Sequence, residues 1–306
     1  MSGTVLRTIG IVLAVGLSFA SVGANEQPPA IQRVLDDNLA KFPGRAGIWV
    51  KHLTTGVEAG VRADDTFNSA SVIKIPVLLL AYQMADKGTL SLDERITIRK
   101  EDIRGGSGIF RYHDIGLQPT LRDVLMQMVI TSDNTATDIA IAKVGGVGRV
   151  NAWLKENGYA DRLSLTQTTG ELFAKYAALP QGANRNEKTN KDRAYWLGEM
   201  TPRATGRMLE AIQKETLVSP KSSQEIIRVM RAQQAGARRL PHFVSLPIAH
   251  KTGDFPPVLA NDVGIVYAPS GPIVISFFTN EITALYGAAE DVMGRTTELI
   301  VEILGR

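Results

Sequence analysis

The 306-residue sequence contains no cysteine and only four histidines. Without cysteine the chain has no disulfide bond, no thiolate nucleophile and no cysteine-ligated metal site. The histidines, His52, His113, His242 and His250, do not stand in a metal-ligand spacing such as H-E-x-x-H. We therefore expect neither a metal site nor another cofactor.

Dense runs of basic residues with interleaved aromatics are also missing, and aromatic residues make up only 6% of the chain. We therefore expect no nucleic-acid partner. The formal net charge is +3 and the isoelectric point is near 9.0, a mild positive excess that favours the approach of carboxylate-bearing substrates. With 44% apolar and 21% charged residues, the composition is that of a globular protein with a sizeable core.

An apolar stretch near the N-terminus, residues 9–20, is too short to span a bilayer comfortably. Arg7 precedes it, and the small residues at 22–24 follow where a signal peptidase cuts. We predict that residues 1–24 are a signal peptide, that the mature chain begins near Asn25, and that the protein is periplasmic or secreted. The mature chain would have no membrane contact and would be a monomer. A retained N-terminal anchor is the alternative, whereas a lipid anchor on cysteine is excluded.

The hydrophobic pattern predicts an α/β protein of the α+β type, with a five-stranded antiparallel sheet flanked by terminal helices. We expect one domain over residues 25–306, in which an all-helical lobe (about 67–235) is inserted into an α/β lobe (about 25–66 and 236–306). The expected strands are 47–53, 57–61, 248–251, 262–267 and 273–279. The expected helices are 31–41, 75–87, 121–130, 135–144, 147–157, 202–213, 220–234 and 288–304.

Ser71 and Lys74 combine a nucleophile with a possible base at the head of an apolar run, residues 75–81. On a helix the two side chains share one face. A serine hydroxyl needs a neighbour that accepts its proton, and a lysine amine does so only if desolvation or another cation lowers its pKa. The N–H groups of a helix N-terminus also stabilise an oxyanion. The pair alone is weak evidence, because a capping serine followed by a solvated lysine has the same spacing.

Two further motifs follow, Ser132-Asp133-Asn134 and Lys251-Thr252-Gly253. Together the three form the ordered set S-x-x-K, S-D-N and K-T-G. With this set the chain, from about Ile31 to its C-terminus, resembles the penicillin-recognising serine hydrolases of the class A β-lactamase type. The resemblance implies an active site in the cleft between the lobes, and a small-molecule β-lactam or a peptidoglycan-like peptide as substrate.

The resemblance also implies catalytic roles. Ser71 is acylated by the β-lactam carbonyl, and Lys74 accepts its proton or orients the site. Which group activates the serine is disputed for the family. Ser132 passes a proton to the departing ring nitrogen, and Asn134 donates to the side-chain amide of the substrate.

For the strand motif the resemblance implies substrate binding. Lys251 senses the substrate carboxylate, Thr252 hydrogen-bonds it, and Gly253 leaves room for a ligand that lies along the strand. The N–H groups of Ser71 and Asp254 would form the oxyanion hole.

Residues around the motifs are open to more than one interpretation. The glycine-rich turn 105–108 brings Ser107 to the cleft rim by resemblance, with Phe110 and Tyr112 as possible walls, but a tight loop has the same sequence. Successive side chains of a strand point to opposite faces of the sheet, so His250 faces away from Lys251 and is expected to have a structural role. An arginine that holds the substrate carboxylate would be one of three, Arg238, Arg239 or Arg295.

The sequence departs from the class A pattern after the S-D-N motif. Class A enzymes hydrolyse the acyl-enzyme with a loop glutamate that an asparagine follows four residues later, and this motif is missing here. A direct alignment puts Gln167 at the position of the acid, and glutamine has no basic form. Glu171 and Glu187 remain as candidate catalytic bases. The polar stretch 180–192 is expected to be a partly mobile loop.

This gap leaves three functions open. If a carboxylate reaches the deacylating water, the protein is a serine β-lactamase that hydrolyses the β-lactam amide through an acyl-enzyme on Ser71. If none does, it resembles a penicillin-binding D-alanyl-D-alanine peptidase or a drug-trapping hydrolase that deacylates slowly. A non-catalytic periplasmic binding module needs an inert Ser71, and the intact Lys74, Asn134 and Lys251 argue against it.

Overall fold

The computed structural model describes residues 1, 3 and 29–306. Apart from residues 1 and 3, the predicted signal segment 1–24 lies outside the described residues. Within the described part of the chain, no helix is both long and apolar enough to cross a membrane.

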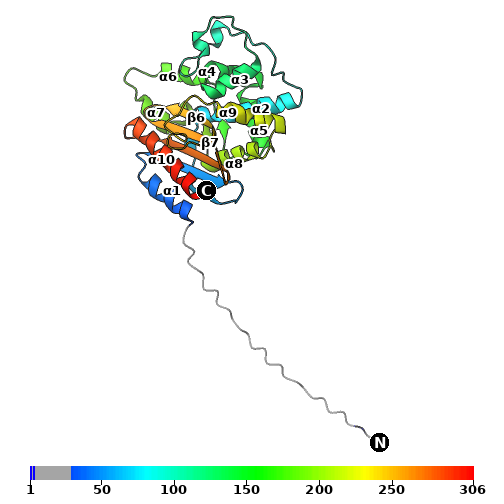
Figure 1. The fold of residues 1–306 in the computed structure, drawn as a ribbon. Coiled ribbons are helices and arrows are strands. Elements are labelled where there is room, and N and C mark those ends of the chain that lie inside the picture. Colours follow the sequence, from blue (N-terminus) through cyan, green and yellow to red (C-terminus); the bar gives the residue numbers. More distant parts are fainter. Residues whose placement is uncertain (2, 4–28) are drawn as a thin grey trace.

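The predicted five-stranded antiparallel sheet is confirmed, with the strand order β2-β1-β8-β7-β6 (Figure 1). The N-terminal hairpin lies along the C-terminal strands, so that Ile48 pairs with Val61 on one side and with Phe277 on the other. The three C-terminal strands run longer than predicted, because their ends carry glycine, proline, aspartate or asparagine, which the sequence analysis took for turn signals. The strands are β1 (Arg45–His52), β2 (Glu58–Val61), β6 (Ile248–Phe255), β7 (Leu259–Ala268) and β8 (Gly271–Asn280).

Helices cover both faces of this sheet (Figure 1). On one face the two terminal helices pack against each other and bury Leu35 and Ile300 with Ile275 of the sheet. On the other face Trp49 packs with the helical lobe. The predicted helix 220–234 ends three residues early, at Arg231. The covering helices are α1 (Ala30–Ala40) and α10 (Tyr286–Leu304) on the first face, and α8 (Pro202–Gln213) and α9 (Pro220–Arg231) on the second.

The helical lobe is organised around α2 (Lys74–Asp86), whose residues 74–82 are all buried. A helix that is apolar on every side belongs in a protein interior, and α2 accordingly contacts several neighbouring helices. Gly88, with φ of +71°, lies just beyond its end. The other predicted helices of the lobe are present as α3 (Leu121–Ile130), α4 (Asn134–Lys143) and α5 (Gly146–Glu156).

The prediction of an all-helical lobe was wrong. A second, three-stranded sheet has the order β3-β5-β4, formed by β3 (Phe67–Asn68), β5 (Gly198–Met200) and β4 (Ser164–Leu165). Strands of two or three residues are too short for the period-two alternation that reveals a strand.

The stretch 180–192, expected to be a partly mobile loop, contains one helix, and a second helix precedes it. Two helices, α6 (Thr169–Ala177) and α7 (Arg185–Lys191), lie between β4 and β5. The side chain of Asn184 caps α7 by accepting from the N–H of Glu187. Because α7 is short and polar, it has no apolar stripe that would have revealed it in the sequence.

Candidate active site

Ser71 lies on a short 3-10 helix, η1 (Ala70–Ile73), that leads directly into α2. We expected a regular α-helical turn here; the structure has a 3-10 turn instead, and Lys74 is the first residue of the α-helix that follows it. Ser71 is partly exposed, whereas Lys74 is buried. Ala70 has φ of +43°, an unfavourable conformation for a residue with a β-carbon. The side chain of Asn68 accepts a hydrogen bond from its N–H at 3.0 Å.

Lys74 connects α2 to the S-D-N motif. Its Nζ donates to the carbonyl oxygen of Ser132 at 2.7 Å, to Ser132 Oγ at 3.2 Å and to Asn134 Oδ1 at 3.0 Å. Burial lowers the pKa of Lys74 well below its usual value, and the nearby charge of Lys251 lowers it further. A lysine in this environment loses its proton more easily than a solvated one, as a proton acceptor requires.

Lys251 approaches the same hydroxyl from β6. Its Nζ donates to Ser132 Oγ at 3.1 Å and to the carbonyl oxygen of Thr252 at 2.8 Å. Burial lowers the pKa of Lys251 to about 8, against the opposing effect of Asp254 and Asp262. The structure thus brings the three motifs together at Ser132.

Asp133 fixes the S-D-N motif rather than facing the substrate. Its carboxylate accepts from the N–H of Ala136 at 2.8 Å, which caps α4. It also accepts from the N–H groups of Ile109 at 2.6 Å and Phe110 at 2.8 Å. A β-carbon at Gly108 would lie 2.3 Å from the carboxylate carbon of Asp133, so this turn approaches the motif as closely as only glycine allows.

The turn 105–108 therefore lies against the S-D-N motif. The aromatic residues that follow it, expected to be walls of the cleft, lie elsewhere. The hydroxyl of Ser107 donates to the carbonyl oxygen of Ser132 at 2.8 Å, which places Ser107 beside the motif. Its own carbonyl oxygen accepts from the N–H of Asn134 at 3.1 Å. Phe110 was a possible wall residue; it is instead buried in the core, because Asp133 draws its backbone inward. Tyr112 is 74% exposed.

Strand β6 presses against the turn that carries Ser71. A β-carbon at Gly253 would lie 2.6 Å from the carbonyl oxygen of Ser69 and 3.2 Å from the nitrogen of Ser71. Glycine is therefore required by close approach of two backbones. Thr252 is buried, and its hydroxyl has no hydrogen-bond partner among the described residues. A buried polar atom without a partner fits a position that a ligand completes.

Of the three candidate arginines, only Arg239 contacts the motif strand. It is buried and donates to the carboxylates of Asp254 and Glu290 and to the carbonyl oxygen of Asn261. The charge of Asp254 raises the pKa of Arg239 despite the opposing effect of burial. The guanidinium is thus engaged within the protein, where it stabilises the end of β6.

The remaining candidates are all paired with acidic residues of the protein. Arg238 and Arg295 form ion pairs with acidic residues of α10 and are both about half exposed. His250 pairs with Asp262 at 2.9 Å, and both side chains are buried. Its position agrees with the structural role expected for it.

Neither candidate glutamate contacts the motif residues in the part of the chain that the structure describes. The carboxylate of Glu171 accepts from the N–H of Thr168 at 2.8 Å and from its hydroxyl at 3.0 Å, a capping box that begins α6 and lowers the pKa of Glu171. Glu187 is 60% exposed and lies 3.8 Å from Lys191. Gln167 is buried with its amide directed at the 194–196 segment.

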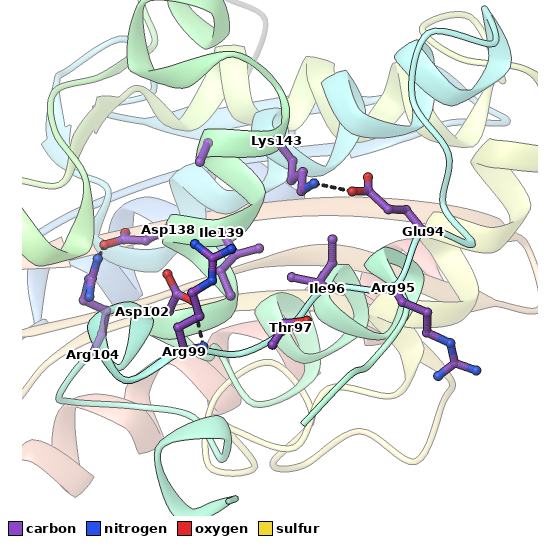
Figure 2. Close-up of a pocket in the computed structure, with 11 residues that line it drawn as sticks. Glu94, Arg95, Ile96, Thr97, Arg99, Asp102, Arg104, Asp138, Ile139 and Lys143 are labelled. Carbon is purple, nitrogen blue, oxygen red and sulfur yellow. Dashed lines mark hydrogen bonds and ion pairs between the residues drawn. The ribbon is translucent and has the colours of Figure 1, made fainter. Parts of the chain in front are cut away.

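Asp138 is a residue near the site that the sequence analysis missed. Its carboxylate accepts from the N–H and hydroxyl of Thr169, both at 2.7 Å, and from the N–H of Gly170 at 2.9 Å. Arg104 donates to it at 2.7 Å, beside a hollow of about 450 Å³ that the three motifs do not line (Figure 2). Asp138 therefore joins the start of α6 to α4. Its position four residues after Asn134, on the same helix face, was the available signal.

Comparison with known proteins places this arrangement in a family. A family model described as "Beta-lactamase enzyme family" matches residues 29–304. The β-lactamase VEB-1 of Pseudomonas aeruginosa is 27% identical over 291 residues, which cover 90% of this chain and 91% of that protein. Beta-lactamase 3 of Bacillus cereus is 25% identical over 86% of this chain and 78% of its own.

Solved structures show the same fold. A β-lactamase from Chitinophaga pinensis has a TM-score of 0.78 at 25% identity and covers 89% of this chain and 98% of its own. A mutant of PBP-A, solved as an acyl-enzyme complex with penicillin G, has a TM-score of 0.74 at 23% identity over 89% and 94% of the two chains. Because the family model spans nearly all described residues, the chain belongs to the beta-lactamase enzyme family and is a serine hydrolase.

Proposed function

We propose that the protein is a serine hydrolase of the class A β-lactamase type that is acylated at Ser71 by β-lactams and releases the acyl group slowly. The observation that carries the proposal is the environment of Lys74: a buried amine with a lowered pKa, three residues after Ser71 and hydrogen-bonded to Ser132 and Asn134. Such an amine would accept the proton of Ser71, and its hydrogen bond to Ser132 would provide a route for the proton onward.

Acylation would follow from these contacts. The hydroxyl of Ser71 gives its proton to the neutral amine of Lys74, and its oxygen attacks the β-lactam carbonyl carbon. The N–H groups of Ser71 and Asp254 stabilise the resulting oxyanion. The C–N bond then breaks, and the ring nitrogen takes a proton from Ser132, which recovers one from Lys74 or Lys251.

The K-T-G strand would hold the substrate carboxylate. Lys251 supplies a positive charge, and the hydroxyl of Thr252, which has no hydrogen-bond partner among the described residues, supplies a donor. Asn134 keeps one amide hydrogen for the substrate, because among the described residues its Nδ2 donates only to the carbonyl oxygen of Gly105, at 2.9 Å.

Slow release is supported by the hydrogen bonds and ion pairs of the carboxylates near Lys74. The acidic side chains whose charges act on Lys74 are Asp133, Asp138 and Asp254. Each is engaged: Asp133 by three backbone N–H groups, Asp138 by Thr169, Gly170 and Arg104, and Asp254 by Arg239 and Tyr286. A water that attacks the acyl ester needs a base to accept its proton, and an engaged carboxylate is a poor one.

The same observation favours a second candidate function. A penicillin-binding D-alanyl-D-alanine peptidase also acylates its serine, and a β-lactam then occupies it for a long time. The engagement of the three carboxylates near Lys74 would suit such an enzyme if its natural acyl group leaves by another route. Release of D-alanine from a peptide that ends in D-alanyl-D-alanine would distinguish this function from β-lactam hydrolysis.

We further propose that the protein is a monomer with one catalytic domain, and the predicted signal segment supports a secreted or periplasmic location. The N-terminal sequence of the exported protein and its mass in solution would test both statements.

Intact-mass spectrometry of the purified chain with benzylpenicillin tests the proposed function. We expect an adduct of one drug mass that persists for minutes, and none in Ser71→Ala. Accumulation of ring-opened product without a lasting adduct would overturn slow release. Labelling that survives Ser71→Ala, or no reaction at all in the unaltered protein, would overturn acylation at Ser71.

A further inference from the structure

The hollow of about 450 Å³ beside Asp138 lies between α4 and the extended segment 94–99, and residues of both line it (Figure 2). Ile96 of the segment and Ile139 of α4 are buried and give the hollow apolar walls. None of the three catalytic motifs lines it. It is therefore separate from the acylation site, although both lie in the helical lobe.

One edge of the segment 94–99 is paired, and the other edge is free among the described residues. Every second residue of the segment forms backbone hydrogen bonds to the segment 116–121, at 2.8 to 2.9 Å: Glu94, Ile96 and Ile98. In an extended chain the backbone groups of successive residues point to opposite edges. The N–H and C=O groups of Arg95 and Thr97 thus lie on the second edge, where no backbone or side-chain group of the described chain meets them. Both residues are exposed.

The hollow has a positive charge that its own acidic residues do not neutralise. Its three carboxylates are engaged within the protein: Glu94 by Lys143, Asp102 by the backbone N–H of Arg99, and Asp138 by Arg104. The guanidinium of Arg99 pairs with no carboxylate in the described part of the chain, and its side chain extends toward α4 (Figure 2). An arginine in this position favours an incoming carboxylate, which it can bind through two parallel hydrogen bonds.

We infer that this hollow is a binding site for an extended peptide that carries a carboxylate. The peptide would add a third strand to the two paired segments and bond to the free backbone groups of Arg95 and Thr97. Its carboxylate would meet the guanidinium of Arg99. An apolar side chain beside that carboxylate would cover Ile96 and Ile139. The backbone bonds would supply affinity for any extended chain, and Arg99 would select an acidic one.

Fluorescence anisotropy with a labelled peptide tests the inference. The probe is fluorescein-labelled Gly-Thr-Val-Thr-Val-Glu, amidated at its C-terminus so that glutamate supplies the only carboxylate of the peptide. Two matched peptides replace the glutamate by glutamine or carry N-methyl groups on alternate backbone nitrogens. We expect the probe to bind and both matched peptides to bind at least about tenfold more weakly.

Preloading the protein with benzylpenicillin should leave binding of the probe unchanged, because the hollow is separate from the three motifs. This control makes the inference independent of the proposed function. If preloading abolished binding, the peptide would lie in the catalytic cleft and the inference would be overturned.

Arg99→Ala should weaken binding of the glutamate peptide about tenfold and change binding of the glutamine peptide less than about twofold. Arg95→Ala is the matched control: it removes the same charge from the same segment, but the guanidinium of Arg95 points away from the hollow and donates to the carbonyl oxygen of Gln118 at 2.9 Å (Figure 2). Thr97→Pro removes one free N–H from the edge and should abolish binding, while urea unfolding checks that this variant is folded.

Three results would overturn the inference. The first is that the glutamate peptide does not bind. The second is an equal loss of affinity in Arg95→Ala and Arg99→Ala, which would mean attraction by net charge alone. The third is equal binding of the N-methylated peptide and its parent, which would mean that the backbone edge takes no part.

Discussion

Lys74 of α2 and Lys251 of β6 donate to the same atom, Oγ of Ser132, at 3.2 and 3.1 Å. Two buried ammonium groups so close together repel each other, and Lys251 is, after burial, the next cause of the lowered pKa of Lys74. One hydroxyl between two lysines can be resupplied with a proton from either side. This relationship leads to the first three predictions.

Lys74→Ala should slow acylation of Ser71 by at least about a hundredfold, because it removes the group that accepts the serine proton. The rate of adduct formation with benzylpenicillin measures the effect. Lys143→Ala on α4 is the control, since Lys143 pairs with Glu94 at the surface and should leave the rate unchanged. Equal rates in Lys74→Ala and the unaltered protein would exclude Lys74 as the proton acceptor.

Acylation by carboxylate-bearing β-lactams should decline above about pH 8. The pKa of Lys251 is lowered to about 8, so its positive charge is lost as the pH rises through that value. The substrate carboxylate then loses its partner. The second-order acylation rate, measured from pH 6 to 10, should show this descending limb, and Lys251→Gln should react slowly and lack it. A limb that persists in Lys251→Gln would assign it to another group.

Lys251→Met should lower acylation while leaving stability unchanged or higher at pH 7. In the folded state the pKa of Lys251 is lowered to about 8, so between about pH 8 and 10.5 the unfolded chain binds more protons than the folded one. The free energy of unfolding should therefore rise with pH across this window, and the rise should be smaller in Lys251→Met. Urea unfolding of both proteins at pH 7 and pH 9.5 measures the stability and its change with pH, and adduct formation with benzylpenicillin measures acylation. A large loss of stability in Lys251→Met at pH 7 would show that Lys251 stabilises the folded protein.

The sequence predicted those parts of the molecule in which a local residue pattern determines the secondary structure. Long periodic helices such as α3, and the glycine-punctuated hairpin of β1 and β2, follow from local pattern alone. The S-D-N and K-T-G motifs were recognised because their residues are adjacent in sequence. Their meeting at Ser132 depends on packing between two lobes, which no local signal encodes.

The polar region between β4 and β5 was the least predictable. Asp138 and Thr169 lie 31 residues apart, and their hydrogen bond sets the start of α6. Glu171 looked like a candidate base, yet its position three residues after Thr168 equally fits a capping box. Sequence spacing alone did not decide between these interpretations; the hydrogen bonds of the folded chain favour the second.

Gly253→Ala should slow acylation about tenfold or more, because its β-carbon would lie 2.6 Å from the carbonyl oxygen of Ser69 and must displace the turn that carries Ser71. Overpacking of this kind costs about 1–3 kcal/mol in the free energy of unfolding. Gly148→Ala is the matched control, since nothing lies within 4 Å of a β-carbon there. The acylation rate and urea unfolding should be measured together. An unchanged rate in Gly253→Ala would mean that the turn tolerates the shift.

Glu171→Gln and Glu187→Gln should each leave the lifetime of the acyl-enzyme unchanged. Glu171 is engaged as a helix cap, a role that glutamine also fills, and Glu187 points to solvent beside Lys191. The adduct lifetime after excess benzylpenicillin is removed gives the measurement, and Glu156→Gln on α5 is the control for loss of a surface carboxylate. A lifetime that lengthens severalfold in one variant only would identify that glutamate as the base. It would also show that the loop moves during turnover, because in this structure neither carboxylate contacts the motif residues.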